Sequence, residues 1–503
     1  MTQPLVVRFG TLHDQLGPPK RDGALMIADG VVAEVSERGL SLPVGALVVD
    51  AVCVVPGLIN AHGHLEQDAT VEPMRWYTAS TPTQRAIHAA GQASRALAAG
   101  VTTLRDLGAS NRIAIEVRDL IRQGKLPGPT VVPAGHVICM TGGHGAFVGR
   151  EADGPDQVRS AVRKERRDGA EVIKFIATGG VLTPGAVPGA QELSEEELRA
   201  GVDEAHRHGL HAAAHAIGTE GIKAALRAGI DSIEHGHLID EEGIELLLDR
   251  EAYLVPTLAA IRRITDAGAE AGLPDYVVRK ASDIAKQAEA NLRRAYQAGV
   301  HIAAGSDAGT PFNPMDGFAY ELELMHSMLG MSPQEVLRAA TVTAADLLGV
   351  MRGTLAPGEV ADLLVLDQDI DDGLQVLRDP RLVIKGGEIV HTRASLSFAG
   401  PHDEEVRDDP GVSDLRVSGG GLLVRTGLGY RLDRQAGTQD GIQPAGQGAA
   451  RIGDRERAVR PWQLRRGGVE APGLGERALV EVVADGQRLP YPGFIVHPAP
   501  DRC

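Results

Sequence analysis

The feature that most constrains the fold is an alternation of short apolar runs with longer helix-like segments. Eight strand-like runs occur, at residues 54–61, 103–107, 130–138, 172–177, 210–215, 232–235, 253–257 and 300–304. Helix-like segments follow them in turn, at residues 82–98, 112–122, 156–167, 194–208, 219–228, 241–248, 277–297 and 315–329. Eight such units over roughly 275 residues are typical of a (β/α)₈ barrel of the TIM type, an α/β fold.

Residues at the ends of these segments support the assignment. Ser194 and Glu197 have the spacing of a capping box at a helix start. Gly209, Gly229 and Gly299 each fall directly after a helix-like segment, where a C-terminal glycine is expected.

The segments that flank the barrel favour a separate β-module. Residues 1–55 contain three short strand-like runs, and Asp29-Gly30 between the last two is a hairpin signal. After a further helix-like segment at 332–348, residues 350–392 return to strand-like runs. Because chain ends of a domain tend to lie close together, we predict a small β-sandwich module from 1–55 and 350–392. The barrel, residues 56–349, would be inserted in it.

Residues 393–503 differ in composition from the rest of the chain. They are rich in glycine, contain no lysine and show weak periodicity. We predict a poorly ordered extension. The alternative is a small β-appendage that uses residues 421–424 and 478–483.

Charge and composition exclude several classes of function. A formal net charge of −16 argues against a nucleic-acid partner, because phosphate binding needs a basic surface. The sequence contains no run of about 18 apolar residues, so no membrane span is expected. The first ten residues do not resemble a signal peptide. Three widely spaced cysteines fit a reducing compartment, so we predict a cytoplasmic protein.

Several possible metal ligands follow the strand-like runs. His62 and His64 are two apart, so they share one face of a strand, and His215, His235 and Asp307 end three other runs. Strand ends converge at the C-terminal face of a barrel, so these side chains can meet at one ion. Taken singly, the histidine pair could be a surface pair, and Asp307 could cap a turn.

Lys174 is unusual because it interrupts an apolar run. A buried lysine is costly unless it is paired or neutralised. Its amine therefore either reaches solvent at a strand end or is modified or close to a metal. His211 lies near the start of the run that ends at His215, which favours a packing role, and His237 is assigned to a loop.

The order of these residues resembles that of the amidohydrolase superfamily, a group of metal-dependent barrel hydrolases. The resemblance covers about residues 5–392 and includes residues 56–64 (PGLINAHGH) and 353–363 (GTLAPGEVADL). Three further motifs are similar to the branch of Xaa-Pro dipeptidases (prolidases) and ochratoxin-type amidases: residues 141–145 (TGGHG), 173–174 (IK) and 178–180 (TGG).

The resemblance implies a site for two divalent ions, of which zinc is the usual metal. All six candidate residues would be ligands: His62, His64 and Asp307 for one ion, His215 and His235 for the other, and carboxylated Lys174 for both.

The implied activity is hydrolysis of amide C–N bonds by metal-activated hydroxide, with dipeptides or N-acyl amino acids as substrates. Asp307 would act as general base and then acid, and His144 would orient the scissile carbonyl. Ile217 departs from the pattern, because many relatives carry an aromatic or polar residue there. Arg105 and Arg150 are the candidates for binding a substrate carboxylate.

Two other functions remain open. The same ligands could serve a lactonase, esterase or phosphotriesterase, because barrel loops set the substrate. A catalytically inactive barrel used for assembly is the third possibility. Association into a homo-oligomer through the outer helices is also an expectation from the resemblance.

Overall fold

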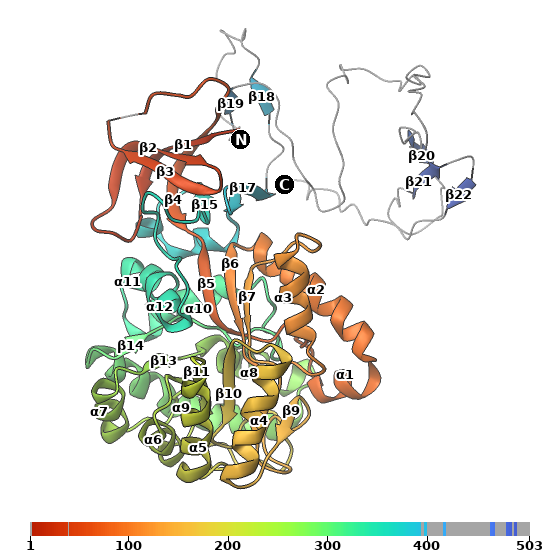
Figure 1. Ribbon diagram of the computed structural model, residues 1–503, viewed down its shortest axis with the longest axis vertical. Coiled ribbons are helices and arrows are strands. Elements are labelled where there is room, and N and C mark those ends of the chain that lie inside the picture. Colours follow the sequence, from red (N-terminus) through yellow and green to blue (C-terminus); the bar gives the residue numbers. More distant parts are fainter. Residues whose placement is uncertain are drawn as a thin grey trace. The chain divides into compact units, whose positions relative to one another are not determined.

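The computed structural model describes residues 3–38 and 40–393, and in the remainder only the backbone of five short strands. The described chain forms a (β/α)₈ barrel and a β-rich module beside it (Figure 1). The predicted fold class, an α/β barrel with a separate β-module, is confirmed.

The β-module is built on one sheet with the strand order β17-β16-β15-β4-β1-β2-β3. Strand β4 joins the two chain segments, because it pairs with β1 in parallel and with β15 antiparallel. Buried aliphatic side chains such as Leu25, Val49 and Leu363 form the core. The strands are β1 (Leu5–Leu12), β2 (Lys20–Ala28), β3 (Val31–Ser36), β4 (Leu47–Pro56), β15 (Leu363–Leu366), β16 (Leu382–Lys385) and β17 (Glu388–Thr392).

The chain leaves the module and enters the barrel at Gly57. The run predicted as one strand at 54–61 therefore belongs to two sheets, ending β4 and starting β5 (Leu58–Gly63). The Gly57 N–H donates to the Asp362 carbonyl at 2.8 Å. A Cβ at Gly57 would lie 2.3 Å from Thr102 Oγ1, so only glycine fits at this crossing.

The barrel closes between its last and first strands. The Ala61 N–H donates to the Ala304 carbonyl and the Asp307 N–H to the His62 carbonyl, both at 2.9 Å. After β5 the barrel strands are β6 (Val101–Asp106), β7 (Thr130–Pro133) with β8 (Val137–Cys139), β10 (Val172–Ile176), β11 (His211–Ala216), β12 (Ser232–His235), β13 (Tyr253–Val255) and β14 (His301–Ile302).

The strand predicted at 130–138 is interrupted. Its halves β7 and β8 both contact β10: the Glu171 N–H donates to the Pro133 carbonyl at 2.8 Å, and Phe175 pairs with Ile138. Both halves therefore contribute to one barrel position. Strand β9 (Gly149–Glu151) extends the sheet beyond β8.

The helices follow the predicted order with three differences. The Ser194 capping box is present, but the helix predicted at 332–348 is two helices that meet near Thr341, and α1 and α8 were not predicted. The helices are α1 (Pro73–Ala79), α2 (Pro82–Ala98), α3 (Ile113–Arg122), α4 (Pro155–Asp168), α5 (Glu195–Arg207), α6 (Thr219–Ala228), α7 (Glu241–Asp249), α8 (Leu258–Ala267), α9 (Asp275–Gln297), α10 (Phe318–Leu324) with a π-helical turn (Met325–Leu329), α11 (Pro333–Ala339) and α12 (Val342–Leu348).

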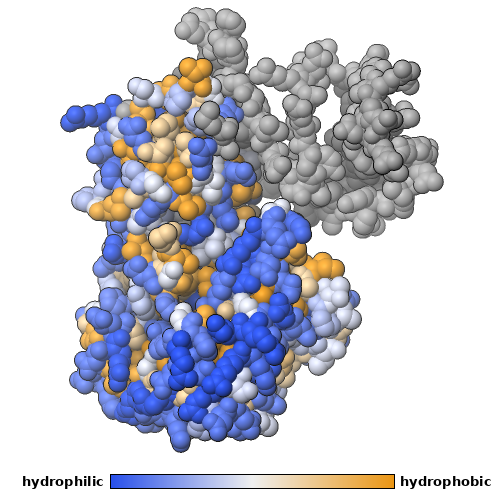
Figure 2. Space-filling model, viewed as in Figure 1, coloured by the Kyte–Doolittle hydropathy of each residue, from blue (hydrophilic) through white to orange (hydrophobic). Residues whose placement is uncertain are grey.

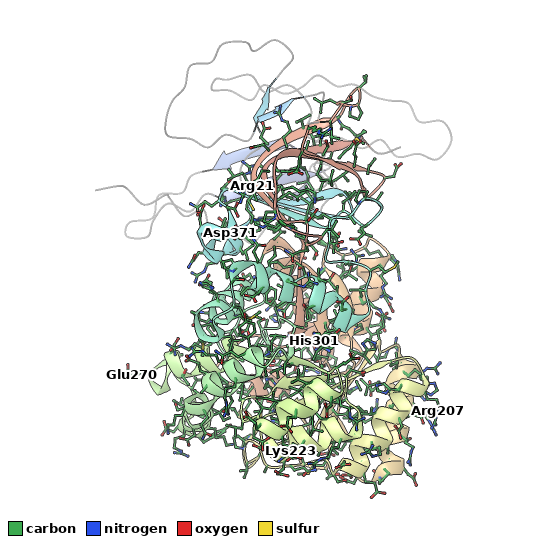
Figure 3. The ribbon with its side chains drawn as sticks, turned by 90° about the vertical axis from the view of Figure 1, so that its left-hand side faces the viewer. Arg21, Arg207, Lys223, Glu270, His301 and Asp371 are labelled. Atoms are coloured by element: carbon green, nitrogen blue, oxygen red, sulfur yellow. The ribbon has the colours of Figure 1, made fainter. Side chains whose placement is uncertain are left out.

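The outer helices turn charged side chains away from the barrel. Figure 3 shows Arg207 of α5 at the edge of the barrel, and Figure 2 shows a largely hydrophilic surface over α4 and α5. Lys223 of α6 pairs between helices, with its Nζ 3.1 Å from Glu242 Oε2 of α7. Within the described residues, no helix has the length and apolar character needed to cross a membrane.

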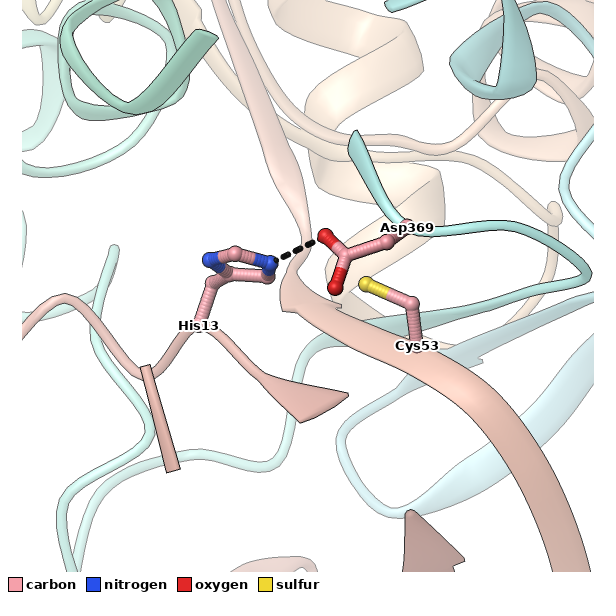
Figure 4. Close-up of side chains that lie close together, drawn as sticks. All are labelled: His13, Cys53 and Asp369. Atoms are coloured by element: carbon pink, nitrogen blue, oxygen red, sulfur yellow. Dashed lines mark hydrogen bonds and ion pairs between the residues drawn. The ribbon is translucent and has the colours of Figure 1, made fainter. Parts of the chain in front are cut away.

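Buried His13 and Cys53 and half-buried Asp369 lie together in the β-module (Figure 4), and Gln334 of α11 contacts this cluster. His13 Nε2 lies 2.8 Å from Asp369 Oδ1, and His13 Nδ1 lies 2.8 Å from Gln334 Nε2. Burial raises the pKa of the neighbouring Cys53 thiol to about 12, so it stays protonated. Because both His13 nitrogens have partners, we interpret the cluster as a structural hydrogen-bonded contact between the β-module and α11.

Beyond residue 393, strands β20 (Gln463–Gly467), β21 (Leu479–Ala484) and β22 (Gln487–Leu489) form an antiparallel sheet. Strand β19 (Arg416–Ser418) pairs with β18 (Ser397–Ala399) and with β4. Strand β21 overlaps the predicted segment 478–483. The predicted segment 421–424, and most of the extension predicted to be poorly ordered, lie outside the described residues.

Candidate metal centre and active site

A pocket lies at the C-terminal ends of the barrel strands. The six predicted ligands and His144 all line it. They come from five strand ends and from the loop between β8 and β9: His62, His64, His144, Lys174, His215, His235 and Asp307. The barrel therefore brings together side chains that are up to 245 residues apart in the chain.

Asp307 lies among the histidines. Its Oδ1 is 3.3 Å from His62 Nε2 and 3.0 Å from His64 Nε2. Possible ligand atoms of His62, His235 and Asp307 all lie within 4.8 Å of one another. His215 continues the cluster, with its ring centroid 4.5 Å from that of His235.

Three buried nitrogen atoms in this pocket have no hydrogen-bond partner: Lys174 Nζ, His215 Nε2 and His237 Nδ1. Lys174 is only 2% exposed, and burial lowers the pKa of its amine to about 8. Unpartnered buried donors are rare, and they call for an explanation such as a bound ion. Imidazole nitrogens with an anionic oxygen are a donor set that suits zinc, so the residues fit a divalent metal ion.

Neighbouring oxygen atoms fix the orientation of three rings. They contact the Nδ1 atoms and leave Nε2 free for other contacts: Glu234 Oε2 at 2.8 Å from His62, the Gly108 carbonyl at 3.2 Å from His64, and Thr257 Oγ1 at 2.7 Å from His235. Second-sphere contacts of this kind orient metal-binding imidazoles and raise their basicity.

Glu234 and Arg105 form a buried ion pair beneath the pocket. Arg105 is 1% exposed, and it donates to Glu234 Oε1 at 2.8 Å, the Ala61 carbonyl at 2.6 Å and Ser232 Oγ at 3.1 Å. All three sides of the guanidinium are thus occupied. Arg105 is therefore a positioning residue that acts through Glu234 on His62, and the interpretation of Arg105 as a carboxylate binder was wrong.

Arg150, the other candidate for a substrate carboxylate, is also paired. Its Nε lies 2.5 Å from Glu165 Oε1, and it is not part of the pocket lining. The structure therefore removes both arginines from the list of substrate contacts.

Two of the predicted ligands have left-handed backbones. The φ angle is 74° at His235 and 56° at Asp307. Such conformations cost about 1–3 kcal/mol for residues other than glycine and occur often at functional sites. His235 has this conformation at the end of β12 and Asp307 in the loop after β14, and both side chains line the pocket.

Burial keeps most of the imidazoles neutral. It lowers the pKa of His62 and of His144 to about 4, and it holds the pKa values of His215 and His235 well below their ordinary value. Burial alone would raise the pKa of Asp307, but His62 and His64 outweigh it and hold that pKa below its ordinary value. At neutral pH the pocket thus offers free imidazole lone pairs and an anionic carboxylate.

The loop that carries His144 is fixed at both the ring and the backbone. His144 Nδ1 lies 2.8 Å from Thr183 Oγ1, and its N–H donates to the Glu192 carboxylate at 2.9 Å. The ring centroid lies 4.5 Å from that of His215. His144 is therefore held beside the candidate metal ligands.

His237 and His211, which the sequence did not assign as ligands, lie at opposite ends of the barrel. His237, assigned to a loop from sequence, lines the pocket, where its Nε2 lies 3.1 Å from the Pro256 carbonyl. His211 sits at the other end of β11, where Nδ1 lies 2.7 Å from the Leu347 carbonyl. Sequence reasoning missed the position of His237 because its apolar run had already ended at His235.

The fold and the site define a barrel hydrolase: the chain belongs to the amidohydrolase family, whose family model matches residues 53–391. Ochratoxinase from Aspergillus niger is 31% identical over 423 residues, which cover 76% of this chain and 86% of ochratoxinase. A crystal structure of a Xaa-Pro dipeptidase with bound methionine in the active site is 30% identical, with a TM-score of 0.69 over 77% of this chain and 99% of that one.

A prolidase crystallised with N-methylphosphonate-L-proline is also similar. It is 29% identical with a TM-score of 0.70, and the match covers 77% of this chain and 99% of the prolidase. These relatives confirm the predicted branch and show that the chain is a hydrolase.

Proposed function

We propose that this protein is a binuclear metal-dependent hydrolase that cleaves amide C–N bonds in small molecules. Dipeptides and N-acyl amino acids were the substrates predicted from sequence. The observation that carries the proposal is Lys174, a buried amine without a partner in a pocket of imidazoles and one carboxylate. The names of the relatives, ochratoxinase and Xaa-Pro dipeptidase, support amide hydrolysis.

The donor set divides between two ions in our proposal. Bound divalent ions would lower the pKa of water and polarise the scissile carbonyl. Zinc is the proposed metal, with all six side chains as ligands: His62, His64 and Asp307 for one ion, His215 and His235 for the other, and carboxylated Lys174 for both.

The environment of Lys174 suits carboxylation. Its pKa of about 8 leaves roughly a tenth of the amine neutral at pH 7, and only the neutral amine has a free lone pair. That lone pair forms an N–C bond with carbon dioxide, and the amine nitrogen then releases a proton. The product is an anionic carbamate, which removes the cost of a buried ammonium.

Asp307 and His144 carry the protein's part of the chemistry. Asp307 is anionic and central, so its carboxylate accepts a proton from the attacking water and delivers it to the departing amide nitrogen. The C–N bond then breaks, and a carboxylic acid and an amine leave. His144 is held by Thr183 and orients the carbonyl oxygen.

The test is a substrate panel on protein with counted metal. Purified enzyme, supplemented with zinc and bicarbonate, is assayed on Xaa-Pro dipeptides, N-acyl amino acids and neutral amides, and on aryl esters, lactones and a phosphotriester. We expect amide hydrolysis that disappears with a chelator and returns with zinc. Turnover of only esters, lactones or phosphotriesters would reject amide hydrolysis, and a metal-free, inactive protein would favour the assembly role.

Two further expectations belong to this proposal. A cytoplasmic location and a homo-oligomer remain predictions. Fractionation of the natural host and size-exclusion chromatography with light scattering test them directly.

A further inference from the structure

We propose that the pocket selects amides whose acyl and amine groups are both apolar and uncharged, in preference to substrates with a free carboxylate. This inference rests on the proposed amide hydrolysis and narrows its substrate class. It opposes the sequence-based expectation of dipeptides and N-acyl amino acids, which carry a carboxylate close to the scissile bond.

The walls of the pocket are aliphatic and aromatic. They are contributed by the loops after β8, β10 and β11 and by helix α8, and they include Phe147, Val181, Leu182, Ile217, Ile261 and Ile264. Ile217 is 3% exposed, and it replaces the polar or aromatic residue expected at this position. Burial of apolar substrate groups against these walls is favourable in proportion to the area removed from water.

Outside the candidate metal site, the lining has no lysine or arginine that could pair with a carboxylate. All lining residues lie in the described part of the chain, and Lys174, an assigned metal ligand, is their one lysine or arginine. Lys280 is close by but donates to the carbonyls of Thr183 at 3.1 Å and Ala186 at 2.6 Å. Arg105 is occupied by the contacts described above.

Two buried polar lining atoms outside the candidate ligand set have no hydrogen-bond partner, Gln67 Oε1 and His237 Nδ1. His237 Nε2 donates to the Pro256 carbonyl, so Nδ1 of the neutral ring is an acceptor, as is the Gln67 oxygen. Both atoms suit an amide or carbamate N–H. Away from the candidate metal ligands, a desolvated substrate carboxylate would find no lysine or arginine partner in the lining, which is costly.

A matched pair of amides tests the selection. N-benzoylphenethylamine and N-benzoylphenylalanine share both rings and the scissile amide and differ only in the carboxylate. We expect kcat/KM to be at least about ten-fold higher for the neutral amide. Equal values, or a preference for N-benzoylphenylalanine, would overturn the inference.

Variants at the pocket wall test whether charge is the cause. Leu182 is half-buried, so a long side chain can be accommodated there. We expect Leu182→Arg to shift the ratio of kcat/KM values towards N-benzoylphenylalanine about ten-fold, and Leu182→Gln, the neutral control, to leave it unchanged. Ile261 of α8 is also half-buried, so Ile261→Arg repeats the test if the first variant folds poorly. An unchanged ratio in folded arginine variants contradicts the inference.

Binding separates this inference from the proposed function. Dissociation constants of both amides are measured by calorimetry on the zinc-loaded enzyme. Tighter binding of the neutral amide without hydrolysis of either would reject the proposed function and uphold the selection. Hydrolysis of both with equal affinity would uphold the function and reject the selection. Absence of binding by the neutral amide would also reject the selection.

Discussion

The buried Arg105–Glu234 pair offers the sharpest test of how the barrel supports its site. Arg105→Met removes the guanidinium and keeps a flexible chain of similar length. Glu234 is fully buried, so the variant leaves an anion without its cation inside the barrel. It also leaves the Ala61 carbonyl without a donor.

The magnitude follows from these contacts. Removal of one partner of a buried ion pair costs about 3–5 kcal/mol, and an unpaired carbonyl adds about 1 kcal/mol. Unfolding entropy of about 2.1 cal/mol/K per residue gives about 0.8 kcal/mol/K for a unit of about 390 residues. We therefore expect Arg105→Met to lower the unfolding midpoint by about 5–7 °C.

Calorimetry or near-UV circular dichroism at one scan rate measures the midpoint. Arg105→Met/Glu234→Gln is the matched control, because it removes the unpaired charge and should recover at least about 2 kcal/mol of the loss. A midpoint of Arg105→Met within 1 °C of wild type would refute the reasoning. So would a double variant whose loss equals the sum of the two single losses.

The pH dependence of the stability difference between wild type and Arg105→Met is a second, independent test. Burial alone would raise the pKa of Glu234, but Arg105, His62 and Lys174 hold it well below its ordinary value of 4.5. A depressed folded-state pKa stabilises the fold above pH 4.5, and this stabilisation is lost as the pH falls. The difference between wild type and Arg105→Met should therefore be largest above pH 4.5 and should shrink towards pH 3.

Three further predictions concern single residues. Asp307→Asn should retain most of its metal, measured by mass spectrometry, and lower kcat by about 10²–10⁴-fold, because it cannot accept a proton; a near-normal kcat would contradict this role. Lys174→Ala should lose at least one ion per chain, whereas Lys286→Ala, at an exposed site on α9, should not. Glu321 accepts from the first two N–H groups of α8, so Glu321→Gln should lose about 1–3 kcal/mol of stability by denaturant unfolding, whereas exposed Glu289→Gln should be neutral.

Local signals were sufficient for most of the barrel. Helices α2 and α6 span the residues predicted from sequence, 82–98 and 219–228. In α2 the Thr81 capping box marks the start, and in α6 Gly229 with φ 93° marks the end. These signals lie within a few residues of the ends that they define, so a single sequence contains them.

The misplaced boundaries depend on tertiary contacts. Helices α11 and α12 separate near Thr341, where the adjacent Ala340 carbonyl accepts a hydrogen bond from the Ile59 N–H of the first barrel strand. Helix α8 starts directly after Pro256 and Thr257; Pro256 ends the preceding strand, but the left-handed φ of 48° at Thr257 is not expected for a β-branched residue. Neither this turn nor the break near Thr341 can be located from the local sequence alone.

The placement of the site residues could be anticipated, but the partners of the charged residues could not. The two-residue period of a strand tells which side chains share a face, and barrel topology brings the strand ends together. The candidate ligands that line the pocket could therefore be predicted. The pairing of Arg105 with Glu234 joins β6 to β12 across 129 residues, and no local pattern encodes it.

This limit explains why the charge of a pocket cannot be inferred from the cations near it in sequence. Arg105 and Arg150 both lie close to pocket residues in the chain, yet carboxylates of other elements neutralise them. Lys280 is similarly occupied by backbone carbonyls. The electrostatics that a substrate meets depend on the charges left unpaired after folding, and in this pocket no lysine or arginine outside the candidate metal site is left unpaired. A sequence that resembles enzymes of carboxylate-bearing substrates can therefore fold into a pocket that favours neutral ones.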